Sequence, residues 1–245
     1  MKIIFIVGTD TDIGKTFSSA FLINYLQRLE QKVVFYKPVQ SGCYSFNNQI
    51  IAPDIEFIKK HCSGMQTHCS YYLKLAATPE LAADKENIKI DFNLIKNDLN
   101  NLINQNPDFL IIEGAGGLIV PLSEKQTIAD LILFLQKDLT AEIFTLLISA
   151  NKLGTINQTC LSAFYADSLG LNLTGFLFCN DHQLSSELKE VLTTNSQFIE
   201  KYGKIKFLGT IPNLKAGIDG NYDFDEIQLN NITIPNFTDL LFKKN

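Results

Sequence analysis

The chain has 245 residues, which corresponds to about one and a half average domains and also fits one large α/β domain. Hydrophobic residues make up 46% and charged residues 19%, near-globular values that exclude a disordered tail, a collagen-like repeat and a coiled coil. The 26 acidic side chains outnumber the 21 basic ones, so the net charge of −5 has the wrong sign for non-specific binding of nucleic acid. We expect one globular domain, residues 1–245, without a nucleic-acid partner.

The odd number of cysteines indicates a reducing compartment, and the short apolar runs indicate neither a signal peptide nor a membrane span. The apolar run Ile3–Val7 is shorter than a signal-peptide core, and no run approaches the ~18 apolar residues of a membrane span. Five cysteines are an odd number and rule out a complete disulfide framework. They are Cys43, Cys62, Cys69, Cys160 and Cys179. We expect free thiols, no membrane association and a cytoplasmic protein.

Continuous apolar runs alternate with segments of helical periodicity along the chain. The first run, 2–7, precedes a loop and then an apolar stripe of helical spacing from Ser18 to Leu29. Further strands are expected at 33–36, 109–112, 143–148, 173–178 and 207–211. Helices are expected at 54–60, 93–103, 128–136, 157–169 and 185–201. This alternation favours an α/β fold, a mainly parallel sheet with helices on both faces. The stretches 44–53 and 62–86 and the tail from Asn213 are interpreted as loops or peripheral elements.

The segment Gly8–Thr16, GTDTDIGKT, has the composition of a phosphate-binding loop. The strict pattern G-x-x-x-x-G-K-[ST] fails by one residue, because Thr9 stands where the first glycine is required. The context fits, since the loop follows a strand and opens a helix, where backbone N–H groups and the helix dipole hold phosphate. Lys15 would reach the β- and γ-phosphates, and Thr16 would offer its hydroxyl to Mg²⁺. The alternative is a strand-to-helix turn with a chance Lys-Thr pair.

Two carboxylates are candidates for holding that cation. Glu113 ends the apolar run Phe109–Ile112 and precedes the small residues Gly114–Gly117, as in a Walker B element. Small residues let the backbone approach a ligand closely. The alternative is a solvated glutamate at a strand end. Asp54 follows Pro53 and has two equally supported interpretations, a second metal ligand or a helix N-cap.

Lys37 follows the second expected strand, where a lysine is more often a solvated surface residue. However, ligands bind outside the carboxyl ends of parallel strands, which meet at one edge of the sheet. Residues with useful chemistry follow the expected strands repeatedly: Gly8, Lys37, Glu113, Ser149–Lys152, Asn180–Asp181 and Pro212. We expect one crevice to collect them.

Several segments, taken in order, resemble the dethiobiotin synthetase family. They are GTDTDIGKT at 8–16, YKPVQSG at 36–42, EGAGG at 113–117, PLS at 121–123, KLGTIN at 152–157, ND at 180–181 and IP at 211–212. Each is modest alone, but their order and spacing from Lys2 to about Leu214 are highly specific. The irregular loop is this family's own form, GTDTxxGKT.

The resemblance implies a P-loop NTPase-like fold and an ATP-dependent carboxylase of biotin synthesis. In that family 7,8-diaminononanoate and CO₂ or bicarbonate give a carbamate, whose oxygen attacks the γ-phosphate. The neighbouring amine then closes the ureido ring of dethiobiotin and releases phosphate. Mg²⁺ and lysine charge neutralise the anions that meet. The family is a homodimer in which the substrate tail reaches the partner subunit.

The resemblance also assigns individual residues. Lys37 is the catalytic lysine, with Lys15 beside it and Thr11 placed to assist, and Ser41 contacts the diamine or its carbamate. Mg²⁺ is held by Thr16, Asp54 and Glu113. The nucleotide contacts Asp12, Ile13, Gly14, Lys15, Thr16, Phe17, Asp54, Glu113, Gly114, Ala115, Gly116, Asn180, Asp181, Pro212, Asn213 and Leu214. Asn180 reads adenine. Gly154 and Asn157 contribute substrate contacts across the dimer interface.

The chain departs from the family pattern in three places. Loop 45–53 has its own composition, Glu80 stands where a histidine is common, and the tail beyond Leu214 is unusually rich in asparagine. No acidic residue of the tail aligns with the ribose-binding acid of relatives. That position stays unassigned.

Other patterns carry less weight. His61-Cys62 and His68-Cys69 lie seven residues apart, which does not fit the spacing of structural zinc sites. Cys43, without a nearby His-Asp arrangement, is interpreted as a packed thiol rather than a nucleophile.

Three rival functions share parts of the pattern. A cobyrinate-type amidoligase needs a glutaminase domain, for which the chain has no room. A GTP-dependent switch needs N-K-x-D, and Cys179–His182 lacks its lysine. A partitioning or division-site ATPase usually has an early lysine in its loop, where this chain has Thr9 or Asp10.

Overall fold

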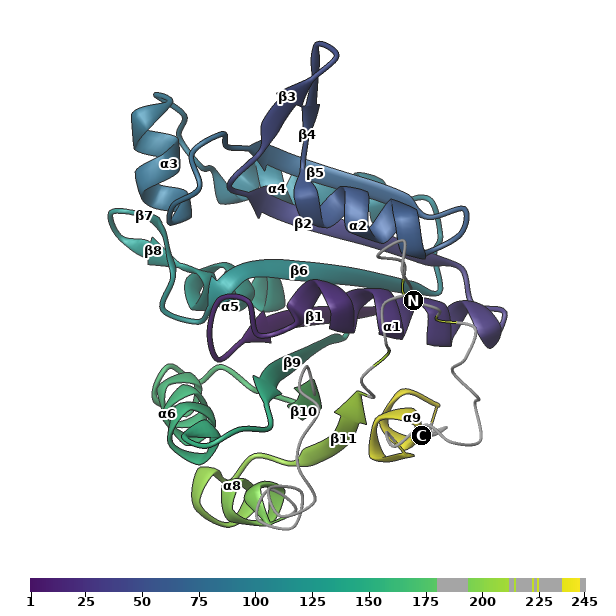
Figure 1. Cartoon of the computed structure of the whole chain (residues 1–245), viewed down its shortest axis with the longest axis vertical. Coiled ribbons are helices and arrows are strands. Elements are labelled where there is room, and N and C mark those ends of the chain that lie inside the picture. Colours follow the sequence, from purple (N-terminus) through teal and green to yellow (C-terminus); the bar gives the residue numbers. More distant parts are fainter. Residues whose placement is uncertain (180–193, 212–213, 215–221, 223, 225–234, 243–245) are drawn as a thin grey trace.

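The computed structural model describes residues 1–179, 194–211, 214, 222, 224 and 235–242. Within them, seven parallel strands form one sheet in the order β11-β10-β9-β1-β6-β2-β5 (Figure 1). The strands are β1 (Lys2–Gly8), β2 (Val33–Gln40), β5 (Gln66–Tyr72), β6 (Phe109–Gly117), β9 (Ile143–Ala150), β10 (Gly175–Cys179) and β11 (Phe207–Ile211). The expected parallel α/β sheet is confirmed, with β1 at its centre.

Helices cover both faces of this sheet. They are α1 (Lys15–Arg28), α2 (Pro53–His61), α3 (Pro79–Lys85), α4 (Phe92–Ile103), α5 (Ile128–Asp138), α6 (Thr155–Ser168), α8 (Asn195–Gly203) and α9 (Pro235–Phe242). Alternate residues of β1 point to opposite faces. Phe5 belongs to the core layer that includes residues of α4, α5 and α6, whereas Ile4 belongs to the layer with α1, α2 and α9. Burial on both faces explains why the central strands are continuously apolar.

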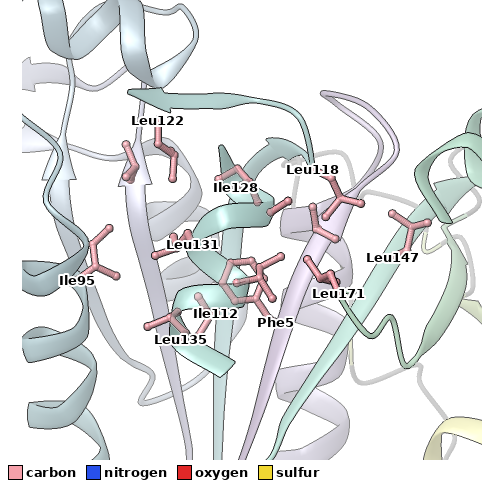
Figure 2. Packing of buried hydrophobic residues seen from close by; sticks show 14 of the residues in the cluster. Phe5, Ile95, Ile112, Leu118, Leu122, Ile128, Leu131, Leu135, Leu147 and Leu171 are labelled. Carbon is pink, nitrogen blue, oxygen red and sulfur yellow. The ribbon is translucent and has the colours of Figure 1, made fainter. Parts of the chain in front are cut away.

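Figure 2 shows how α5 packs on the centre of the sheet. Ile128, Leu131 and Leu135 recur at helical spacing and face Phe5 of β1 and Ile112 of β6. All five side chains are buried. Each contributes about 1.5–3 kcal/mol relative to an exposed position. This packing fixes β1 and β6, the two strands that lead into the phosphate loop and Glu113.

The segments expected as loops or peripheral elements contain secondary structure, part of it peripheral and part of it in the main sheet and core. Residues 44–53 include an antiparallel hairpin of β3 (Tyr44–Phe46) and β4 (Gln49–Ile51), which projects from the rest of the chain (Figure 1). Residues 62–86 contain the edge strand β5 and helix α3. The tail contains α9, whose Phe237 and Leu241 join the core. A second small hairpin pairs β7 (Pro121–Ser123) with β8 (Gln126–Thr127).

Three further expectations concern a helix, the cysteines and membrane spans. The expected helix 185–201 is described only as α8, and residues 185–193 lie outside the described part. All five cysteines lie in the described residues, where they are buried and form no disulfide. No helix in the described ranges is long and apolar enough to cross a membrane.

Candidate active site

The loop between β1 and α1 has the geometry of a phosphate-binding loop. Gly14 begins α1 in the left-handed region, with φ of 91°. A β-carbon at this position would lie 2.5 Å from the sulfur of Cys179, so the position requires glycine. Lys15 turns its side chain back over the loop, and its Nζ donates to the carbonyl of Asp10 at 2.9 Å. The first turn of α1 lines a cavity. Its backbone N–H groups have no acceptors within the helix, so they are available to bind phosphate there.

Three charged side chains meet beside this loop. Lys37 Nζ lies 2.8 Å from Glu113 Oε1 and 2.7 Å from Asp54 Oδ2. The side chains of Lys37 and Glu113 are only 4% and 1% exposed, so neither is the solvated strand-end residue that the sequence left open. The cap of α2 is Ala52, so Asp54 is not a helix cap but a member of this cluster.

Hydroxyl groups of α1 complete the cluster. Thr16 Oγ1 donates its one proton to Glu113 Oε1 at 2.9 Å, and the hydroxyl also lies within hydrogen-bonding reach of the Asp54 carboxylate. A hydroxyl and two carboxylates are oxygen donors, the kind of ligand that Mg²⁺ prefers, and Mg²⁺ usually takes its other ligands from water and substrate phosphates. The donor set of Thr16, Asp54 and Glu113 therefore fits a divalent cation next to bound phosphate.

Burial and opposite charge set the protonation of these groups. Burial acts to lower the pKa of Lys37, but the carboxylates of Glu113 and Asp54 outweigh it, and the pKa is raised above the ordinary lysine value. Burial acts to raise the pKa of Asp54, but Lys37 outweighs it, and the pKa is lowered. For Lys15 burial dominates and the pKa is lowered. The carboxylates thus hold Lys37 as the ammonium, whereas burial works against the charged form of Lys15.

A cavity of about 740 Å³ joins these groups, a volume typical of small-molecule sites. Residues singled out from the sequence that line it are Thr11, Asp12, Gly14, Lys15, Thr16, Phe17, Lys37, Ser41, Asp54, Glu113, Ala115 and Gly116. The expected convergence is therefore present at the carboxyl ends of β1, β2 and β6, but Gly8 and Ser149–Lys152, which were expected in the same crevice, do not line this cavity. Residues 76–79, at the start of α3, also line the cavity.

The remaining predicted residues lie elsewhere. Ile13 and Leu214 are buried in the core layer with α1. Gly114 lies behind the cavity, where its carbonyl accepts a hydrogen bond from Lys37 Nζ at 3.3 Å. Gly154 and Asn157 are exposed at the start of α6, outside the cavity lining. Asn180, Asp181, Pro212 and Asn213 lie outside the described residues.

The sequence did not single out Ser19 or Gln40. Ser19 Oγ lies 2.7 Å from Glu113 Oε2. Gln40 lines the cavity and donates from Nε2 to the carbonyl of Ser41 at 3.0 Å. Ser19 follows Lys15 by one helical turn, which places the two residues on the same side of α1. That spacing was the available signal.

The histidine and cysteine pairs do not gather. His61 belongs to α2 and contacts Phe57 at 4.4 Å between ring centroids, whereas His68 belongs to β5 and stacks on Tyr36. Burial raises the pKa of Cys62 to about 12, which disfavours the thiolate that a metal needs. Within the described residues, no group of three or more His, Cys, Asp or Glu side chains could hold a metal. Burial also raises the pKa of Cys43 to about 11, as in a packed thiol.

A parallel sheet with a phosphate loop after its central strand defines a P-loop nucleotide-binding fold. Residues 2–218 match a family described as an AAA domain. The MinD cell division protein of Aquifex aeolicus superposes with a TM-score of 0.58 at 14% identity, covering 100% of this chain and 99% of that one. The signal recognition particle receptor FtsY of Elizabethkingia anophelis gives 0.53 at 15% identity, covering 100% and 64%. At such identities the likeness concerns the fold alone.

Curated relatives define the family more closely. The ATP-dependent dethiobiotin synthetase BioD of Caldicellulosiruptor saccharolyticus is 33% identical over 100% of this chain and 97% of its own length. The proteins of the same name from Anoxybacillus flavithermus and Methanocaldococcus jannaschii are 35% and 33% identical, covering 87% and 91% of this chain and 93% and 99% of theirs. The chain belongs to the ATP-dependent dethiobiotin synthetase family, a family of ligases. The resemblance inferred from the motifs is confirmed.

Proposed function

We propose that the chain closes the ureido ring of dethiobiotin from 7,8-diaminononanoate and CO₂ or bicarbonate, converting ATP to ADP and phosphate. The observation that carries this proposal is the pair of buried lysines, Lys15 and Lys37, in one cavity with a phosphate loop and two carboxylates. Such a cavity suits a reaction in which two anions must meet. The names of the relatives support the choice of substrate.

The proposed reaction has three steps. An amine of the diamine adds to CO₂, forms a carbamate and loses a proton. A carbamate oxygen then attacks the γ-phosphorus, and the bond to the ADP oxygen breaks, which gives a carbamic-phosphoric anhydride. The second amine attacks the carbonyl carbon and loses a proton to solvent, the C–O bond to phosphate breaks, and phosphate leaves as the ring closes. In the second step, the Lys15 and Lys37 ammonium groups stabilise the charge on the approaching oxygens, because fixed charges in a dry site act more strongly than in water.

Thr16, Asp54 and Glu113 are the residues that would hold Mg²⁺. Bound there, the cation would neutralise charge on the β- and γ-phosphate oxygens. Residues 12–17 would surround the phosphates. We further propose that Asn180 reads adenine and that Asp181, Pro212, Asn213 and Leu214 complete the nucleotide pocket, as the resemblance implies.

Ser41 and Thr11 are the proposed contacts of the diamine or its carbamate. The Ser41 hydroxyl oxygen is buried and has no hydrogen-bond partner among the described residues. A buried polar group without a partner is costly, so a ligand that rotates the hydroxyl into the cavity would relieve that cost. Thr11 lies at the exposed edge of the same cavity.

We propose that the active unit is a homodimer with Gly154 and Asn157 serving the partner's site. Leu153, just before α6, and Leu161 and Phe164, within it, are 76%, 57% and 49% exposed. Neighbouring apolar side chains with such exposure are typical of a protein interface. We also propose that residues 1–245 act as one domain and that the protein is cytoplasmic.

The proposal is tested by following ADP release with 7,8-diaminononanoate and bicarbonate present together or singly. We expect ADP release to require both, with one dethiobiotin formed per ADP. Hydrolysis that is indifferent to the diamine would instead fit a partitioning ATPase, and hydrolysis of GTP alone would fit a switch. Either result would overturn the proposal.

A further inference from the structure

Ser19 makes a hydrogen bond that the proposed reaction does not yet use. It lies within α1, is fully buried, and places Oγ 2.7 Å from Glu113 Oε2 and 3.0 Å from the carbonyl of Lys15. A serine hydroxyl has one proton and both neighbours are acceptors. The proton is donated to the closer, charged carboxylate, because hydrogen bonds to ionised groups are the stronger ones.

The two carboxylate oxygens of Glu113 have different hydrogen-bond partners. Oε1 accepts from Thr16 Oγ1 at 2.9 Å and from Lys37 Nζ at 2.8 Å, and both of these residues line the cavity. Oε2 accepts from Ser19, which lies one turn further along α1 than Thr16 and is not among the cavity-lining residues. The last torsion of a glutamate side chain has a broad energy profile, so nothing intrinsic to the residue holds the plane of the carboxylate.

We propose that Ser19 is a positioning residue that fixes the carboxylate plane of Glu113 and presents Oε1 alone to the divalent cation. The inference rests on the proposed metal role of Glu113. Mutation of a group that holds a metal ligand in place typically lowers metal affinity by about 10–100-fold. A serine that only satisfied its own helix would bond the carbonyl one turn earlier and leave Glu113 untouched.

Ser18 provides that comparison within the same helix. It is also fully buried, and its Oγ donates to the carbonyl of Gly14 at 2.7 Å. No contact with Glu113 is recorded for it among the described residues. Ser18→Ala and Ser19→Ala therefore remove the same atom from equally buried positions of α1, but only Ser19→Ala removes a hydrogen bond to Glu113.

The test measures binding of Mn²⁺, a paramagnetic substitute for Mg²⁺, by electron paramagnetic resonance with a non-hydrolysable ATP analogue present. We expect Ser19→Ala to weaken Mn²⁺ binding by roughly tenfold to a hundredfold. Ser18→Ala should leave it unchanged, and both variants should lower the melting temperature, Ser19→Ala by more, because it leaves a buried carboxylate oxygen without its donor. Analogue affinity in chelator, without metal, should be the same for all three proteins. Ser19→Cys, close in size and a weak donor, should bind Mn²⁺ with intermediate affinity and serves if Ser19→Ala does not fold.

Glu113→Gln separates failure of this inference from failure of the proposed function. If Glu113→Gln weakens Mn²⁺ binding and Ser19→Ala does so no more than Ser18→Ala, the positioning role is wrong and the metal role of Glu113 stands. If Glu113→Gln leaves Mn²⁺ binding unchanged, the metal role of Glu113 and the positioning role of Ser19 are both wrong.

Discussion

Lys37 and Glu113 form a buried ion pair across two neighbouring strands, with Nζ of the lysine 2.8 Å from Oε1 of the glutamate. The same Nζ lies 2.7 Å from Asp54 Oδ2 on α2. One cation thus neutralises two carboxylates that burial would otherwise make costly. The Lys37 ammonium therefore has two roles: it takes part in the proposed reaction, and it stabilises the fold through the ion pair.

Replacement of Lys37 should slow turnover far more than it weakens nucleotide binding. Loss of one fixed electrostatic donor from a dry site typically costs about 2.7–4 kcal/mol, or roughly 10²–10³ in kcat. We expect this loss for Lys37→Gln at saturating ATP and diamine. Thr16, Glu113 and the loop N–H groups remain to hold the nucleotide, so its affinity by calorimetry should change much less. A kcat within about tenfold of the wild type would remove Lys37 from the mechanism.

Lys37→Met should also destabilise the fold. Removing one partner of a buried ion pair leaves an uncompensated charge and costs about 3–5 kcal/mol in the free energy of unfolding. Lys59 pairs with Glu56 at 3.0 Å on the surface, where the side chains are 50% and 46% exposed. Lys59→Met is the matched control and should cost within about 0.5 kcal/mol. Urea unfolding measures both, and equal losses would contradict the assignment of Lys37 to a dry site.

The lowered pKa of Asp54 sets the direction of one pH dependence. Its folded-state value lies below the ordinary 3.8, so the ionised carboxylate stabilises the fold above that pH. This stability is lost as the pH falls through the folded-state pKa. The difference in unfolding free energy between wild type and Asp54→Asn should therefore shrink as the pH is lowered from about 6 to about 3. A difference that stays constant or grows toward acid would show that Lys37 does not stabilise this carboxylate.

Much of the fold follows from the pattern of the sequence, because buried parallel strands need apolar residues on both faces. Continuous apolar runs such as Ile3–Val7 and Phe109–Ile112 therefore predict buried strands. The edge strand β5 was missed because QTHCSYY contains no aliphatic residue and an edge strand is only half covered. Helix α3 was missed because its proline reads as a breaker, although proline is well suited to the first turn where it lies.

The candidate site was predictable where a strand end, a glycine or a lysine marks it. Lys37 and Glu113 were both singled out, but their direct pairing was not, since the register of β2 against β6 is a tertiary property. Ser18 and Ser19 are neighbours of the same type, and only the rotation of α1 decides which of them reaches Glu113. Asp54 was left undecided for a similar reason, because its role depends on the direction in which α2 enters the cluster.

Shared sites in a dimer predict complementation. Lys37→Ala protein and Asn157→Ala protein should each be weakly active alone. Mixed after co-expression, heterodimers should regain part of the activity, because one of the two sites then holds both intact residues. Heterodimers proven by tag-based purification that stay as inactive as either parent would contradict the proposed role of the start of α6.

The transfer of oxygen from CO₂ to phosphate tests the proposed reaction most directly. In a single turnover with ¹⁸O-labelled CO₂ in unlabelled water, the carbamate oxygen that attacks the γ-phosphorus leaves with it. Each dethiobiotin formed should therefore release one phosphate carrying one ¹⁸O, detectable by mass spectrometry. Dethiobiotin formed with unlabelled phosphate would contradict the attack of a carbamate oxygen on ATP.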